Sequence, residues 1–132
     1  MNILEGKIKA IKVDGHLSLV RIEVGTTVLT SIVIDTPATA SYLAPQHAVK
    51  VIFKETEVML GKGTEHPISL QNRLIGRVKS IESGQLLSKL VLDTSAGSVT
   101  SIITTNAVKQ LELTEGAEVT AMIKTNEMML SA

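Results

Sequence analysis

Hydrophobic and polar residues alternate along short stretches of this chain, and turn residues separate the stretches. Over 74–81 the apolar positions recur every second residue, which is the period of a half-buried β-strand. Polar, glycine-containing turns follow at 82–85 and 94–97, on either side of a second apolar stretch at 86–92. A third stretch, 99–104, is rich in β-branched residues. The pattern therefore predicts three strands in succession.

A short helix is expected after the third strand. It covers about 107–111, and Asn106 stands where an N-cap residue is favoured. Two further strands are expected at 118–123 and 128–130. The order strand, strand, strand, helix, strand, strand is that of a five-stranded OB-type barrel.

The whole pattern occurs twice, because a shift of 70 residues aligns the sequence with itself without gaps. Identical pairs recur along the alignment, among them Asn2 with Asn72, Thr30 with Thr100 and Lys54 with Lys124. In the first copy Thr36 is the expected helix cap, with Pro37 at the first helical position. The sequence thus predicts an all-β protein with short helices, built as two tandem OB-like five-stranded β-barrels. Their expected limits are 1–62 and 69–132, with 63–68 as the linker.

Composition limits how these barrels can be stabilised. A domain of about 60 residues is marginal alone, since it buries only roughly 60% of its unfolded surface. The chain has no cysteine for a disulfide, and its three histidines lie far apart without metal-ligand spacing. We therefore expect packing between the two copies or between chains, and a homo-oligomer.

Charge and aromatic content exclude other classes of protein. Thirteen basic and thirteen acidic residues give a net charge of zero, and the only aromatic residues are Phe53 and Tyr42. A nucleic-acid partner is disfavoured, because it needs clustered positive charge or stacking platforms. No apolar run reaches the ~18 residues of a membrane span, and the N-terminal residues lack the layout of a signal peptide. We expect a soluble, cytoplasmic protein with no membrane partner.

No catalytic constellation is present in the sequence. There is no cysteine nucleophile, and no histidine lies beside a plausible serine or carboxylate partner in both copies. Carboxylates such as Glu55 and Glu82 fit ordinary strand and turn charges, and no carboxylate loop suits a free metal cation. The protein is not expected to be an enzyme or to hold a cofactor.

Both copies do keep a lysine at the end of the fourth strand, Lys54 and Lys124. Neutral hydrogen-bond donors stand at neighbouring element ends in the second copy: Ser69, Gln71, Asn72, Thr104, Thr105 and Asn106. Such donors with one cation suit a small tetrahedral dianion. Composition alone favours the ordinary interpretation, in which the lysine is a solvated strand end and the others are simple helix caps. The residues alone leave both interpretations open.

Three segments of the second copy resemble the Mop family, also called molbindin or molybdenum-pterin-binding-type and related to TOBE domains, in its tandem form. They are Ser-Leu-Gln-Asn-Arg-Leu-Ile-Gly-Arg-Val at 69–78, Ile-Thr-Thr-Asn-Ala-Val-Lys at 103–109 and Val-Thr-Ala-Met-Ile-Lys-Thr-Asn at 119–126. The resemblance covers 69–132, and the repeat extends it more weakly to 2–60. It implies an OB-like fold that binds molybdate or tungstate, for storage or homeostasis of the oxyanion in the cytoplasm. It also implies trimers with oxyanion sites at subunit interfaces.

The oxyanion ligands that the resemblance implies are Ser69, Asn72, Thr104, Lys124 and Thr125. Lys54 keeps the position of Lys124 in the first copy, whereas Ile34 and Pro37 replace hydroxyl-bearing positions there.

Two departures from the family pattern weaken the expected site. Gln71 stands in place of the family's arginine, and Ala107 in place of a serine. Arg73 lies two residues after Gln71, on the same face of an extended strand, and is a candidate to replace the missing arginine. The alternative function is a degenerate Mop-type module that acts in assembly or regulation without tight oxyanion binding.

Overall fold

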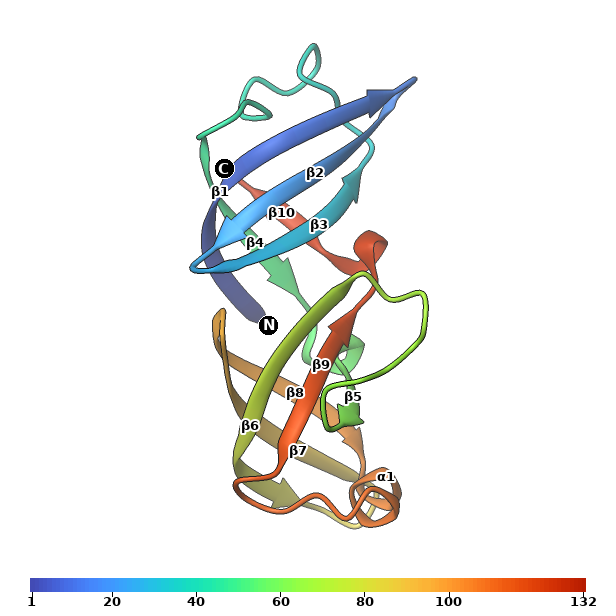
Figure 1. The fold of residues 1–132 in the computed structure, drawn as a ribbon. Coiled ribbons are helices and arrows are strands. Elements are labelled where there is room, and N and C mark those ends of the chain that lie inside the picture. The colour runs from blue at the N-terminus through green and yellow to red at the C-terminus, as the bar shows by residue number, and fades with distance from the viewer.

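The computed structural model describes all of residues 1–132. Two antiparallel sheets stack end to end along the molecule (Figure 1). In chain order the elements are β1 (Asn2–Asp14), β2 (Leu17–Val24), β3 (Thr27–Val33), β4 (Ala48–Phe53), the 3-10 helix η1 (Glu55–Glu57), β5 (Met59–Lys62), β6 (Asn72–Ser83), β7 (Leu87–Thr94), β8 (Gly97–Thr104), α1 (Thr105–Gln110), β9 (Glu118–Ile123), the 3-10 helix η2 (Thr125–Glu127) and β10 (Met129–Ser131).

Each sheet has five strands and curls into a barrel. The first has the order β10-β4-β1-β2-β3, and the second has the order β5-β9-β6-β7-β8. The edge strands β10 and β3 approach each other without pairing, as do β5 and β8, so each sheet curls into a partly open barrel. The predicted fold class, an all-β chain of two five-stranded OB-like units, is confirmed.

The last strand of each copy lies in the sheet of the other copy. β5 pairs with β9, with Met59 opposite Met122, and β10 pairs with β4, with Met129 opposite Ile52. The red C-terminal strand therefore enters the upper barrel in Figure 1, beside β4. The expectation that 128–130 completes its own barrel is wrong. The 3-10 helices carry the chain across, since η1 packs against β8 and η2 against β3.

The predicted limits, 1–62 and 69–132, therefore mark the sequence repeats but not the sheets. Hydrogen bonds fix both crossings in the same way. Ser31 Oγ donates to the carbonyl of Met128 at 2.7 Å, and Ser101 Oγ donates to that of Val58 at 2.8 Å. Both serines are fully buried, so each crossing is tied to the middle of an opposing strand.

A single apolar core runs through both barrels. It joins 22 buried residues from the two copies, including Phe53 and Val51 of β4 and Leu74 of β6. Packing between the copies was one of the two sources of stability expected for such small units. The structure provides it through this shared core and the exchanged strands.

The helices differ from the sequence prediction. α1 begins at Thr105, and its cap is Thr104, whose Oγ1 accepts a hydrogen bond from the Ala107 amide at 3.0 Å. The prediction of Asn106 as the cap is wrong, because Asn106 is already helical. The first copy forms no helix after Thr36 but only a turn. Ile34 occupies the position of Thr104 there and offers no oxygen that could cap a helix.

Candidate functional site

The antiparallel pairing of β6 with β9 brings two predicted site segments together. Asn72, the first residue of β6, lies opposite Ile123, the last residue of β9. The residues just before β6 and just after β9 therefore meet at one end of the sheet. They line a small pocket of about 80 Å³, made by Ser69, Leu70, Gln71, Lys124 and Thr125. Four of these five residues were predicted site residues; Leu70 was not.

The pocket offers neutral donors and one cation. Ser69 and Thr125 carry hydroxyls, and Gln71 carries an amide. Lys124 is exposed and has no carboxylate within ion-pair distance; the ion pairs present join Met1 to Glu55 and Arg77 to Glu118. No carboxylate lines the pocket. The arrangement is suited to a small anion rather than to a cation.

Asn72 does not line this pocket, although it was a predicted ligand. Its side chain is 1% exposed and bonds to the backbone of β3. The amide Nδ2 donates to the Thr30 carbonyl at 2.8 Å, and Oδ1 accepts from the Thr30 amide at 2.7 Å. Its polar atoms are thus occupied in joining the two copies.

Arg73, the suggested replacement for the family's arginine, also points elsewhere. Its Nε donates to the carbonyl of Leu70 at 2.9 Å, and its Nη2 donates to that of Ile68 at 2.5 Å. Both acceptors belong to the connection between β5 and β6. The guanidinium therefore contacts the backbone of the segment that forms one wall of the pocket.

Thr104 lies apart from the pocket within one chain. It ends β8 and caps α1, and β8 packs against η1, whereas Thr125 opens η2, which packs against β3. The structure thus brings Ser69, Gln71, Lys124 and Thr125 together, and does not bring Thr104 to them.

Lys54 occupies the repeat-related position in the first copy, with different neighbours. Glu55 replaces Thr125 there and lies 3.8 Å from the amino group of Met1, and Glu57 follows in the same 3-10 helix. Glu57 has a counterpart in Glu127 of η2, so the difference between the copies is Glu55, whose charge next to Lys54 opposes the binding of an anion. Lys54 does not line the pocket formed by the second copy.

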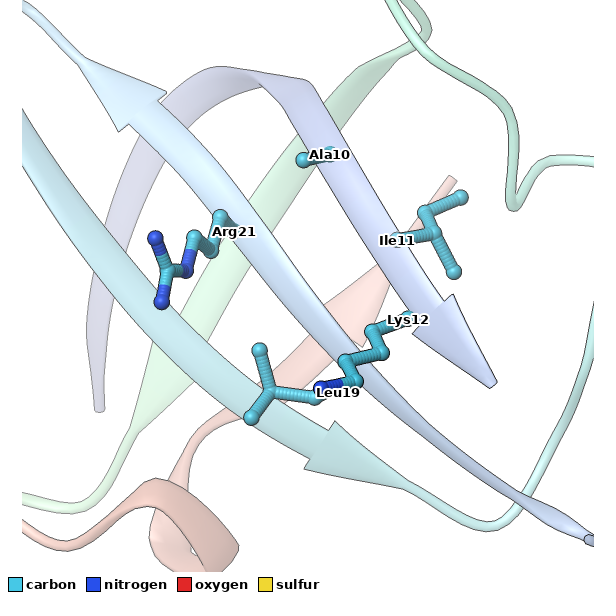
Figure 2. Close-up of a pocket in the computed structure, with 5 residues that line it drawn as sticks. All are labelled: Ala10, Ile11, Lys12, Leu19 and Arg21. Carbon is cyan, nitrogen blue, oxygen red and sulfur yellow. The ribbon is translucent and has the colours of Figure 1, made fainter. Parts of the chain in front are cut away.

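A larger pocket of about 250 Å³ lies on the outer face of β1 and β2 and is lined by Ala10, Ile11, Lys12, Leu19 and Arg21. Figure 2 shows Ile11 directed away from Leu19, and Lys12 beside Leu19, its partner in the strand register. The Arg21 guanidinium lies apart from Lys12 in this view. The two cations do not converge on one point, and the pocket has few other donors, so its side chains suit a small oxyanion less well.

Titratable groups elsewhere provide no competing site. Partial burial, together with the negative charge of Asp35, raises the pKa of Tyr42, which does not line any of these pockets.

No cluster of three or more His, Cys, Asp or Glu side chains is placed to hold a metal ion. None of the helices has the length and apolar character needed to cross a bilayer.

The positions of Leu70 and Arg73 in the structure had no direct signal in the sequence. Leu70 looked like an ordinary apolar residue. For Asn72, the identity of Asn2 at the repeat-related position was the available signal, because Asn2 makes the equivalent bonds to Thr100.

The TOBE domain family matches residues 68–130. The molybdenum-pterin-binding protein MopB of Rhodobacter capsulatus is 31% identical over 128 residues, which are 95% of this chain but 47% of MopB. The chain thus spans about half the length of that relative. Molybdenum-pterin-binding protein 1 of Clostridium pasteurianum is 39% identical over 66 residues, which are 49% of this chain and 97% of that protein.

A solved structure is similar along nearly the whole chain. It is that of ModG, described as a cytoplasmic molybdate-binding protein and solved with molybdate bound. The two structures superpose with a TM-score of 0.89 at 28% sequence identity, covering 99% of this chain and 95% of ModG. The similarity to ModG therefore covers both barrels of this chain, in structure as well as in sequence.

Proposed function

The chain belongs to the family of molybdenum-pterin-binding proteins, and from this premise we propose that it binds molybdate or tungstate in the pocket of its second copy. The observation that carries the proposal is the convergence of Ser69, Gln71, Thr125 and the unpaired Lys124 around one small cavity. These residues come from two segments that are more than fifty positions apart in the chain. Their meeting follows from the register of β6 and β9.

The chemistry of the pocket fits a tetrahedral oxyanion. Molybdate and tungstate are dianions whose four oxygens only accept hydrogen bonds, and the hydroxyls, amide and ammonium of the pocket can all donate. Charge-assisted bonds are roughly twice as strong as neutral ones, so Lys124 contributes most. Its single charge leaves a dianion only half neutralised.

A homo-oligomer, and specifically a trimer, would complete the site. Apolar side chains are exposed near the ends of strands in both copies, including Leu17, Ile34 and Leu87. Because Thr104 lies apart from Lys124 within one chain, it acts as a ligand only if a neighbouring subunit supplies it. We place the function in cytoplasmic storage or homeostasis of the oxyanion, without catalysis.

Titration calorimetry of the purified protein with molybdate, tungstate and sulfate in parallel tests the proposal. We expect saturable binding of molybdate or tungstate, with sulfate as the comparison for size and selectivity. Light scattering on the same samples measures the oligomeric state. If neither molybdate nor tungstate binds, the degenerate assembly or regulatory module becomes the better account. A stable monomer of about the chain mass of 14.1 kDa would contradict the trimer.

A further inference from the structure

The connection between β5 and β6 forms one wall of the candidate pocket but has few anchors of its own. Gly63 is held at its start by bonds to Glu118 and Thr120. From there to the start of β6, the backbone makes one internal bond, from Ile68 to His66, and none to a strand. His66 packs over Gly61, where an added Cβ would meet its ring at 2.5 Å. The half of the connection that carries Ser69 and Gln71 lacks these supports.

Arg73 supplies the missing anchor. It lies within β6, and its guanidinium donates to the carbonyls of Ile68 and Leu70 at 2.5 Å and 2.9 Å. These acceptors flank Ser69 on both sides. Fixing both carbonyls leaves the intervening residue little freedom to rotate, and it fixes the backbone immediately before Gln71.

The planar guanidinium suits this task. Its donors have a fixed fork geometry, so two acceptors bound by one fork are also held relative to each other. A lysine ammonium keeps the charge but has no such fork. Charge and geometry can therefore be separated by substitution.

Arg73 is also specific to the copy that has the pocket. The repeat-related residue of the first copy is Ile3, which is exposed and has no donor. In that copy Glu55 replaces Thr125 as well. The anchor and the pocket thus occur together.

We propose that Arg73 is a positioning residue, which holds the 68–70 backbone so that Ser69 and Gln71 face Lys124, and that it does not bind the oxyanion itself. This inference rests on the proposed oxyanion function for its effect on affinity, but not for the anchor. The anchor exists before any ligand binds. It can therefore be tested in ligand-free protein.

The experiment compares Arg73→Lys and Arg73→Gln with the wild type. Hydrogen exchange of peptides covering 64–71 is measured without ligand, and molybdate affinity is measured by calorimetry. Arg77→Gln is the matched control, since Arg77 lies on the same face of β6 and also donates to a carbonyl, that of Gly116 at 2.9 Å. Thermal unfolding shows whether each variant is folded.

Both Arg73 variants should exchange faster over 64–71, with β6 and β9 unchanged, and both should bind molybdate roughly tenfold more weakly. The control should match the wild type in both measurements. Unchanged exchange over 64–71 would overturn the anchor. Wild-type affinity in Arg73→Lys with a loss only in Arg73→Gln would show that charge matters, and would overturn the positioning role. If the wild type binds no molybdate, the proposed function fails, while exchange still decides the anchor.

Discussion

Asn72 holds both backbone polar groups of Thr30 with one side-chain amide, at 2.7 and 2.8 Å. The contact extends the hydrogen-bonding pattern of β3 sideways onto the other copy, because a primary amide presents a donor and an acceptor just as a peptide group does. Asn2 makes the same pair of bonds to Thr100, both at 2.8 Å. The two copies are thus joined reciprocally.

Replacing Asn72 with alanine should destabilise the protein without affecting the pocket directly. The change leaves the N–H and C=O of Thr30 without partners in a part-buried contact, which costs about 1–3 kcal/mol. Urea unfolding measures the loss, and Asn2→Ala should lose a similar amount. Asn106→Ala, at an exposed helical position, is the control. A loss below about 0.5 kcal/mol, the range of neutral surface changes, would contradict the role of the contact.

Lys124→Ala should weaken oxyanion binding about ten- to a hundredfold. Hydrogen bonds to charged groups contribute about 1.5–3 kcal/mol, and every 1.4 kcal/mol is tenfold in affinity. Lys109→Ala, on the exposed surface of α1, removes the same charge away from the pocket. Calorimetry should find the control close to the wild type. Equal affinities in the two variants would place the oxyanion elsewhere.

Lys54→Ala, by contrast, should change molybdate affinity by about twofold or less. Lys54 does not line the pocket, and the adjacent Glu55, which stands where the second copy has Thr125, opposes an anion. Lys54 can still attract the anion by long-range electrostatics, which salt screens beyond about 8–10 Å. Titrations at two ionic strengths measure this effect on molybdate affinity. A loss as large as that of Lys124→Ala would show that the first copy takes part in binding.

Gln71→Arg should tighten molybdate binding by roughly tenfold. Gln71 already lines the pocket, so the substitution adds a second cation and a bidentate donor where one charge now faces a dianion. Gln110→Arg adds the same charge at an exposed position of α1 and serves as the control. Tighter binding in both variants would indicate a general effect of net charge. No gain in either would mean that Gln71 does not face the ligand.

Cutting the connection between the copies should leave them associated. A protease site inserted between Thr64 and Glu65 separates the chain into two fragments after cleavage. β5 of the first fragment remains in the sheet of the second, and β10 of the second remains in the sheet of the first. The fragments should co-elute in gel filtration and separate only in denaturant. Separation in native buffer would show that the exchanged strands contribute little.

Local pattern predicted most of the strands, whereas much of the pocket was expected from the family resemblance. The strand at 118–123 has the predicted limits, and the pocket residues Ser69 and Lys124 meet through the pairing of β6 with β9. Local pattern was insufficient to assign β5 and β10 to their sheets. A strand of three or four residues satisfies the same alternation in either sheet, so its partner depends on the path of η1 and η2 rather than on its own residues.

The predicted orientation of Arg73 shows a second limit of what sequence alternation can predict. Alternation placed Gln71 and Arg73 on the same side of an extended strand. The strand begins only at Asn72, however, so Gln71 precedes it and the two-residue period does not extend to it. Arg73 could therefore turn back to the connection while Gln71 lines the pocket.

The exchange of β10 into the first sheet also sets the order in which the protein can be assembled during synthesis. β10 leaves the ribosome after the nine other strands, yet it pairs with β4, which emerges less than halfway along the chain. The N-terminal barrel therefore stays incomplete, with β4 unpaired along one edge, until the second copy has been translated. Such long-range pairing slows folding and leaves an edge open to other chains in the meantime. Loss of a few C-terminal residues would accordingly damage the barrel at the opposite end of the sequence.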